Sequence, residues 1–404
     1  MEKTRLLIVT EEPFRNNSFG FGRTITNLFS AFEIEQTILY VKDGEYTHPD
    51  YRFDTNTIYF NARLFRCNKP KWYAPLLNKL YFPLNHSYLY LRSNKDNINL
   101  LKKFDPDIVL IVPMDYTTLL EGYLTARRLK KPFIVYLMDD SLRIQGFHIG
   151  GSTNYFHQKI MSEASGWMMI SEYLTKAMVK KFPKHPPYNL VVHNPIEEKF
   201  IQTISQKSAN KNLFRVSYAG SIHAFHADAL INFARAVQQL RRKGVAIELT
   251  VYCQDFAWST YKSALNIEGV VYAGILPYDQ LFSELNKSDL LLCTTSFDQV
   301  HRHLVETSVF TKITDYMAAA VPVLSYGPEY AANSKYLEKK AVGFVFANSD
   351  VNLLAEYIEY LMNKIKFERI SIIEKQLEVI SREHTFTVVS KLIANFFMDI
   401  KKAA

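Results

Sequence analysis

The chain has few cysteines and no long apolar run, and both shortages narrow the class of protein. Its 404 residues include only three cysteines, an odd and widely spaced set without a metal-ligand pattern: Cys67, Cys253 and Cys293. Such usage is typical of a reducing compartment. No run of 18 or more apolar residues occurs, and the start MEKTRLLIVT is a charged stretch before a short strand, unlike a signal sequence. We therefore expect a soluble cytoplasmic protein.

Missing motifs argue against two common functions. After Gly20 and Gly22, Ile25 stands where the dinucleotide-binding fingerprint G-x-G-x-x-G has its third glycine, which argues against a dehydrogenase. No cluster of His, Cys and carboxylate residues has the spacing of a metal site, so we expect neither a metal nor another cofactor. The D-x-D string at Asp105 and Asp107 precedes the apolar run IVLIV, and we interpret it as a turn.

The composition allows two domains. With 48% apolar residues, the chain can bury two sizeable cores, so we expect two domains of ~200 residues each. The net charge of +8, from 48 basic and 40 acidic residues, favours anionic partners. This charge does not choose between nucleotides, lipid head groups and nucleic acid.

Strand-like apolar runs alternate with amphipathic helical stretches, which predicts parallel sheets covered on both faces. A first series of strands is expected at Leu6–Thr10, Gln36–Val41, Ile108–Val112, Ile134–Met138, Trp167–Ile170 and Leu190–His193. A second is expected at Phe214–Ala219, Ile247–Cys253, Val270–Tyr272, Leu290–Cys293, Val323–Ser325 and Gly343–Phe346. Proline-rich and polar stretches separate the series. We predict an α/β protein with two Rossmann-like, doubly wound domains at 1–195 and 196–380, and a helix at 381–404 that packs back toward the first.

The most informative segment is SVFTKITDYMAAAVPVLSYGP, residues 308–328, where a polar helix start precedes a buried strand. Ser308 and Thr311 are residue types that cap helix N-termini. Lys312 would oppose the helix dipole in the first turn unless an anion such as a diphosphate binds there. Asp315 shares its helix face and can accept hydrogen bonds from a ribose diol. The alternative is a surface ion pair between Lys312 and Asp315, worth about 0.3 kcal/mol.

This segment resembles the nucleotide-sugar-binding segment of GT-B-fold glycosyltransferases, closest to glycosyltransferase family 4. In that family the second Glu of an E-x7-E motif binds the donor ribose and "A-M-A-A-G-x-P-V" follows. Asp315 falls on the second Glu, whereas Thr307 replaces the first Glu and Ala320 replaces the usual Gly. Some divergent members are similar in having S-x-x-x-K-x-x-[DE]-Y, which this chain matches at Ser308, Lys312, Asp315 and Tyr316.

Other segments extend the resemblance. Residues 168–182 and 191–200 are similar to the end of a family-4 N-terminal domain, with its "S-E-x-L" helix and "N-P-[IV]-[DE]" turn. Tyr218-Ala219-Gly220-Ser221 is similar to the turn that opens the C-terminal domain and faces the donor. The glycine loop at Gly20, Gly22 and Arg23 resembles one that borders donor and acceptor, and its alternative is an ordinary glycine turn.

The resemblance does not by itself indicate which cation would bind the donor phosphates. Family members usually carry an Arg or Lys just after the Gly-[ST] turn, and residues 222–228 contain neither. Lys312 and Arg302 are the candidates to replace it, since Arg302 could clamp a phosphate with two hydrogen bonds. Both could equally be surface residues.

Asp139 and Asp140 end the apolar run FIVYLM, and the carboxyl ends of parallel strands open into the binding cleft. Paired carboxylates raise each other's pKa, so one of them is a candidate base. The alternative is that one caps the next turn and the other is solvated.

Residues 59–95 lack acidic side chains and interleave basic residues with aromatic ones. The basic residues are Arg63, Arg66, Lys69, Lys71, Lys79, Arg92 and Lys95. Such a segment suits an anionic membrane surface, although a nucleic-acid surface uses the same residue types and a core helix pair with solvated lysines is a third interpretation. A lipid-linked acceptor favours the membrane, at its inner face, and we expect no nucleic acid.

The resemblance implies a glycosyltransferase that moves a sugar from a nucleoside diphosphate sugar to a cell-envelope glycan or glycolipid. Family 4 retains anomeric configuration, so no protein base is required. The expected site comprises Gly220, Ser221, Arg302, Ser308, Thr311, Lys312 and Asp315 for the donor, Gly20, Gly22 and Arg23 at the donor and acceptor loop, and Asp139, Asp140 and Lys312 as catalytic candidates. Two alternatives stay open: a nucleotide-sugar 2-epimerase of the same fold, and a catalytically silent nucleotide-binding subunit, which the missing first Glu at Thr307 favours.

Overall fold

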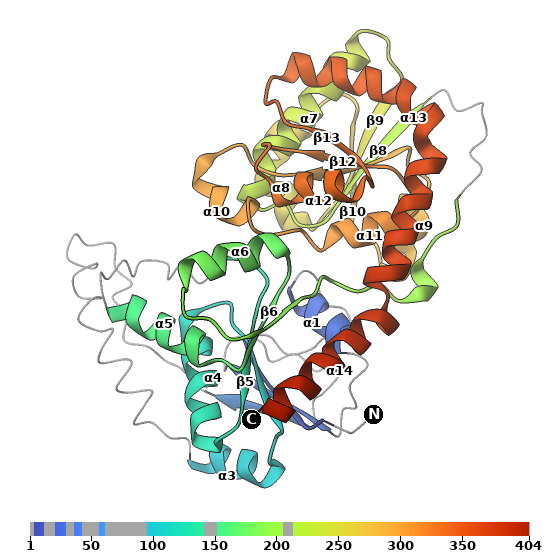
Figure 1. Cartoon of the computed structure of the whole chain (residues 1–404). Helices are drawn as coiled ribbons and strands as arrows, with labels where there is room; N and C mark the ends of the chain where they lie inside the picture. The colour runs from blue at the N-terminus through green and yellow to red at the C-terminus, as the bar shows by residue number, and fades with distance from the viewer. Residues whose placement is uncertain are drawn as a thin grey trace, which may run out of the picture. The chain divides into compact units, whose positions relative to one another are not determined.

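The computed structural model divides the chain into two units (Figure 1), one formed by residues 1–192 and 390–404 and the other by 193–389. It describes residues 4–11, 21–29, 36–42, 56–60, 95–140, 152–204 and 213–403. Within these ranges no helix combines the length and the apolarity needed to span a membrane.

The described part of the N-terminal unit contains a parallel sheet of seven strands in the order β3-β2-β1-β4-β5-β6-β7. The strands are β1 (Leu6–Thr10), β2 (Thr37–Lys42), β3 (Thr57–Phe60), β4 (Ile108–Val112), β5 (Phe133–Leu137), β6 (Gly166–Met169) and β7 (Tyr188–Val191). The chain adds strands on one side of β1 and then, from β4 onward, on the other. The order therefore reverses between β1 and β4, and such a switch point is where open α/β sheets bind ligands.

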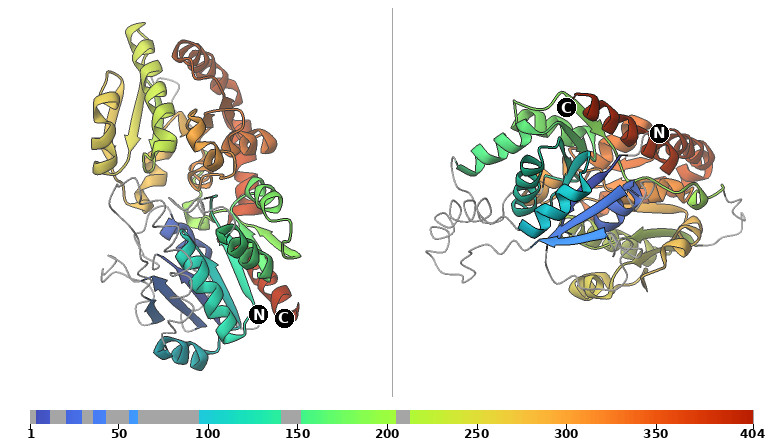
Figure 2. Two further views of the ribbon diagram at one scale, coloured as in Figure 1. Left: turned by 90° about the vertical axis from the view of Figure 1, so that its left-hand side faces the viewer. Right: turned by 90° about the horizontal axis from the view of Figure 1, so that it is seen from below.

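Alternate side chains of these buried strands point to opposite faces of the sheet. One face packs on α4 (Tyr116–Leu129), α5 (Ser152–Glu163) and α6 (Glu172–Lys181), with the fully buried Trp167 in the shared core. The other helices that the structure describes in this unit are α1 (Phe21–Phe29), α3 (Lys95–Phe104) and, from Ser390 onward, α14 (Phe386–Ala403). Figure 2 shows α14 beside the sheet. A Cβ on Gly166 would lie 2.8 Å from Phe396 and 2.9 Å from Ile400, so the sheet and α14 require glycine there.

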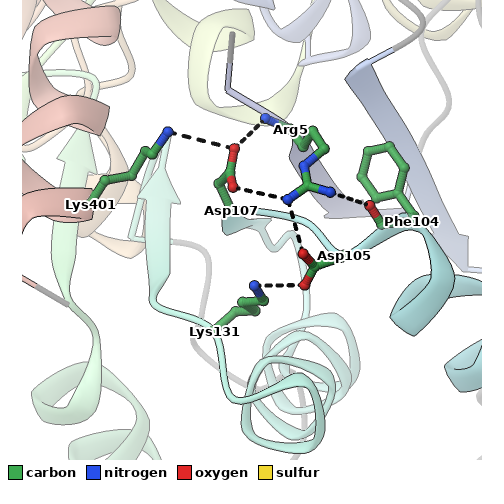
Figure 3. A network of polar contacts seen from close by, with 6 residues as sticks. All are labelled: Arg5, Phe104, Asp105, Asp107, Lys131 and Lys401. Carbon is green, nitrogen blue, oxygen red and sulfur yellow. Dashed lines mark hydrogen bonds and ion pairs between the residues drawn. The ribbon is translucent and has the colours of Figure 1, made fainter. Parts of the chain in front are cut away.

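A network of charges ties this unit together at the amino ends of its strands (Figure 3). Arg5, just before β1, bonds Asp105 and Asp107 at 2.9 and 3.4 Å. Lys131, before β5, lies 2.8 Å from Asp105, and Lys401 of α14 lies 3.6 Å from Asp107. The D-x-D string is thus a turn, as predicted. Its carboxylates form ion pairs at the amino ends of the strands, whereas ligands of such sheets bind at the carboxyl ends.

The C-terminal unit has a parallel sheet of six strands in the order β10-β9-β8-β11-β12-β13. These are β8 (Phe214–Ala219), β9 (Ile247–Tyr252), β10 (Val270–Gly274), β11 (Leu290–Thr294), β12 (Val323–Tyr326) and β13 (Phe344–Phe346). Its strand order reverses between β8 and β11. The predicted pair of doubly wound parallel sheets is therefore confirmed.

Helices also line both faces of this second sheet. On one face, α7 (Ala224–Arg242) and α13 (Val351–Val379) pack on the inward side chains of the strands, for example Leu249 and Leu292. The other described helices are α8 (Asp255–Leu265), α9 (Tyr278–Asn286), α10 (Arg302–Val305), α11 (Lys312–Ala318) and α12 (Ala332–Lys340). Ala320 follows α11 with φ of 54°, a left-handed conformation that explains why related sequences prefer glycine there.

Candidate functional site

The switch point of the C-terminal sheet is built around Gly220, the first residue after β8. Gly220 has φ of 133°, a conformation that favours glycine. A Cβ at this position would lie 3.4 Å from Nζ of Lys312, so the missing side chain lets the lysine approach the turn. In the next residue, the Ser221 hydroxyl donates to Oε1 of Gln254 at 3.0 Å. The structure thus brings Gly220, Ser221 and Lys312 together, as the sequence analysis expected of a donor site.

Within the described part of the chain, Lys312 forms no ion pair with a carboxylate. Nζ donates to the Tyr218 hydroxyl at 3.1 Å and lies 4.3 Å from the centre of that ring. The expected alternative of a direct ion pair with Asp315 is not formed, although the Asp315 charge still raises the pKa of Lys312 from a distance. Burial lowers the pKa of Lys312 to about 8. An anion bound beside Gly220 would stabilise this ammonium.

Asp315 lies one helical turn after Lys312, half-buried. Its Oδ1 accepts a hydrogen bond from the Tyr278 hydroxyl at 3.0 Å. Tyr278 begins α9 and packs edge-on against Phe200. This contact between distant segments could not be predicted from sequence spacing, and it fixes the direction of the carboxylate.

The two predicted helix caps behave differently from expectation. Thr311 occupies the N-cap position of α11, but its side chain makes no capping hydrogen bond, because its φ and ψ of −56° and −30° are helical rather than extended. Ser308 lies before the cap and is buried, and its backbone N–H donates to Leu304 O. Thr307, at the position of the first Glu, donates to His303 O at 2.7 Å.

Arg302, the other expected phosphate ligand, already has partners. Its Nε lies 3.0 Å from Oε2 of Glu306, and its guanidinium lies 4.5 Å from the centre of the Tyr330 ring. A role in phosphate binding would require Arg302 to share or leave Glu306. Lys312 is therefore the better supported of the two cations.

The N-terminal candidates are placed less completely. Gly22 and Arg23 lie in the first turn of α1, whereas Gly20 lies outside the described residues. Asp139 and Asp140 follow β5, and Oδ1 of Asp140 accepts from Nζ of Lys181 at 2.8 Å. A base at Asp140 would have to break or share that ion pair. Of the basic, aromatic segment 59–95, residues 61–94 lie outside the described ranges.

A cluster at the N-terminal switch point escaped the sequence analysis. Glu11, directly after β1, accepts hydrogen bonds from the backbone N–H groups of Met114 and Asp115 at 2.8 to 3.0 Å. Asp115 caps α4 through Thr118 N and pairs with Nζ of Lys42 at 2.5 Å. Burial and the neighbouring Asp115 raise the pKa of Glu11 to about 8. Glu11 directly follows β1 and Asp115 lies three residues after β4, and these positions just beyond adjacent strands were the sequence signal that could have identified them.

Comparison with solved structures identifies the class of fold. A glycosyltransferase from Rickettsia africae ESF-5 superposes with a TM-score of 0.67 at 11% identity, covering 100% of both chains. Anabaena Alr3699/HepE, solved in complex with UDP-glucose, gives 0.64 at 13% identity over 98% of this chain and 99% of that one. The α,α-trehalose 6-phosphate synthase from Burkholderia multivorans gives 0.65 at 14% identity over 100% and 98%. The chain has the GT-B fold.

The family comparison is more specific for the second unit. Residues 214–364 match the family model described as glycosyl transferases group 1. The C-terminal unit therefore contains a group 1 glycosyltransferase domain, in agreement with the predicted resemblance. No curated protein sequence matches the chain.

Proposed function

We propose that the protein transfers a sugar from a nucleoside diphosphate sugar to a cell-envelope glycan or glycolipid. The observation that carries the proposal is the Lys312 ammonium, which lies at the Gly220 turn of a group 1 glycosyltransferase domain and forms no ion pair with the carboxylates that the structure describes. Desolvation lowers the pKa of this lysine to about 8, and groups with such shifted pKa values concentrate at functional sites. The donor diphosphate is the anion that this position would bind.

Different groups of the site would bind different parts of the nucleotide-sugar donor. The Gly220 turn gives the diphosphate close access to the backbone, and Lys312 neutralises the charge that grows on it as the glycosidic bond breaks. Asp315, oriented by Tyr278, would accept hydrogen bonds from the ribose diol. Because Lys312 supplies the positive charge, we propose that transfer needs no divalent metal, and by resemblance to family 4 that it retains anomeric configuration.

The acceptor side rests on the sequence. The basic and aromatic residues between 59 and 95 suit an anionic membrane surface, which would bring a lipid-linked acceptor to a peripheral enzyme at the inner face of the membrane. We propose that Arg23 of α1 and the switch-point pair of Glu11 and Asp115 contact a substrate on this unit, since ligands bind where the strand order reverses.

One observation favours a second candidate, a catalytically silent nucleotide-binding subunit. Thr307 replaces an acidic residue of the family motif, and its hydroxyl is engaged by the His303 carbonyl. Such a subunit would keep Lys312 and Asp315 for nucleotide binding without transferring a sugar.

Incubation with a panel of nucleotide sugars, with and without EDTA, tests the proposal. We expect slow release of nucleoside diphosphate from one donor through hydrolysis, unchanged by the chelator. An isomeric sugar nucleotide as the product would instead indicate a 2-epimerase, and nucleotide binding without any turnover would indicate the silent subunit. Activity that disappears in EDTA and returns with magnesium or manganese would contradict the metal-independent mechanism.

Replacing Asp315 with alanine should weaken nucleoside diphosphate binding by about 1.5–3 kcal/mol, the range for hydrogen bonds to a charged group. Tyr278→Phe, which removes the 3.0 Å hydrogen bond and keeps the ring, should lose less, because the carboxylate remains. Calorimetric titration measures both. Equal affinity of the Asp315→Ala variant and the parent would mean that Asp315 does not bind ribose.

A further inference from the structure

Two buried polar side chains hold the backbone immediately before Lys312. Nε2 of His193 lies 2.9 Å from the carbonyl oxygen of Val309. Oδ1 of Asn333, on α12, accepts a hydrogen bond from the N–H of Phe310 at 2.8 Å. His193 is 7% exposed and Asn333 is fully buried. We call residues 307–311 the donor loop, and these two contacts grip its backbone from two different elements.

The protonation of His193 follows from its partner. A carbonyl oxygen can only accept, so Nε2 must carry a proton. Burial lowers the pKa of His193 to about 4, so the ring is neutral, with its proton on Nε2, near pH 7. The hydrogen bond to Val309 is therefore fixed across the physiological range.

His193 also stands where the chain passes from the first unit to the second. It is the first residue of the range 193–389. Three residues later, Ile196 pairs with the return segment, through Ile196 N to His384 O at 2.7 Å and Phe386 N to Ile196 O at 3.0 Å. The segment that leaves the first unit and the segment that returns to it are thus hydrogen-bonded to each other. We call these two segments, residues 193–196 and 384–386, the paired crossing.

The returning segment contacts the same support. The His384 ring lies edge-on to His193, with centres 5.6 Å apart, and its Nε2 lies 2.7 Å from the Tyr336 hydroxyl. Tyr336 lies one turn after Asn333 on α12. Both segments of the paired crossing therefore contact the residues that hydrogen-bond to the donor loop, or the helix that holds them.

We infer that His193 and Asn333 are positioning residues of the donor site, which set the place of the Lys312 ammonium and couple it to the paired crossing of the chain. Lys312 begins α11 two residues after Phe310, so a shift of the donor loop moves its side chain relative to Gly220. Binding of a diphosphate at Lys312 should in turn restrain the crossing. The inference rests on the proposed donor site.

A double-mutant cycle tests the positioning role. His193→Phe keeps an aromatic ring in the buried position and removes the N–H group that donates a hydrogen bond to Val309 O. We expect this variant to bind the tightest of UDP, GDP and ADP about tenfold more weakly than the parent, as for one buried hydrogen bond. In a Lys312→Met background the same change should have no further effect, because His193 acts through that ammonium.

Two variants serve as controls. His193→Gln can place its amide Nε2 as a donor to Val309 O and should keep most of the affinity. Gln376→Leu also removes a buried side-chain hydrogen bond to a backbone carbonyl, that of Val342 at 2.8 Å, which is not part of the donor loop. It should lower thermal stability and leave nucleotide affinity unchanged. If His193→Phe does not fold, Asn333→Leu enters the same cycle with the same expectation.

Hydrogen exchange tests the coupling. Nucleotide should slow exchange of the Ile196 and Phe386 amides in the parent, and this protection should be lost in His193→Phe. Additive effects in the cycle would overturn the positioning role, and unchanged exchange would overturn the coupling, in both cases while the parent still binds nucleotide. A parent that binds none of the three nucleotides would contradict the proposed function itself.

Discussion

Replacing Lys312 with methionine should weaken nucleoside diphosphate binding by about 2–5 kcal/mol, because it removes one partner of a desolvated charge pair. The fold should not suffer. The Lys312 pKa of about 8 lies below its ordinary value, which means that the ammonium, although still protonated near pH 7, lowers the stability of the folded protein. Methionine removes the cost of desolvating this charge, so the midpoint of thermal unfolding should stay level or rise. Calorimetry should show the loss of affinity for the nucleoside diphosphate.

The same lysine predicts the sign of a pH dependence. Below pH 8 the ammonium is protonated and ready for a diphosphate, and above pH 8 binding must first add a proton. Affinity should therefore fall by up to tenfold per pH unit above 8, and bound nucleotide should raise the pKa of Lys312. Lys312→Arg, which stays charged, should flatten the profile. A parent profile that is flat between pH 7.5 and 9.5 would mean that the diphosphate does not contact this ammonium.

Replacing Arg63, Arg66, Lys69 and Lys71 with serine should remove up to ~4 kcal/mol of attraction to anionic vesicles, at about 1 kcal/mol for each basic residue. Co-sedimentation with liposomes rich in phosphatidylserine should fall and lose its sensitivity to salt. Hydrolysis of the nucleotide sugar in solution should not change, because Gly220, Lys312 and Asp315 are untouched.

Circular dichroism of the fourfold variant is the control for folding. Lysine and arginine stems that pack a core would unfold the protein when replaced, and the spectrum would show it. Co-sedimentation of the folded variant equal to that of the parent would assign the segment 59–95 to a role other than membrane docking.

The fold was predictable because its strands are buried on both faces and therefore form continuous apolar runs. Runs such as LLIVT before Glu11 and IVLIV before Pro113 mark β1 and β4 without ambiguity. β3 was missed, since Thr57–Phe60 is a four-residue edge strand whose burial is incomplete and whose pattern is therefore weak. Strand boundaries shifted by one or two residues, as in β7, and the helix expected at 381–404 begins at Phe386, because the sequence pattern does not mark where hydrogen bonding changes.

The proximity of the candidate site residues was predictable where they are close in sequence. Lys312 and Asp315 share one helical turn, and Gly220 stands in a recognisable turn after a strand. Their orienting partners, Tyr218 and Tyr278, lie 94 and 37 residues away. Such contacts depend on how strands and helices assemble, which no spacing rule contains. The His193 brace of the donor loop was missed for the same reason, with 116 residues between its partners.

The composition of the N-terminal unit has a consequence for how the protein is made. Residues 390–403 of α14 belong to this unit, where Phe396 and Ile400 pack on Gly166 and Lys401 reaches Asp107. The ribosome makes this part of α14 only after residues 193–389, so the sheet of residues 1–192 is synthesised well before the helix that covers this part of its surface. The C-terminal unit, by contrast, is continuous from 193 to 389 and can complete itself earlier. We expect residues 1–192 expressed alone to aggregate, and residues 193–389 to fold.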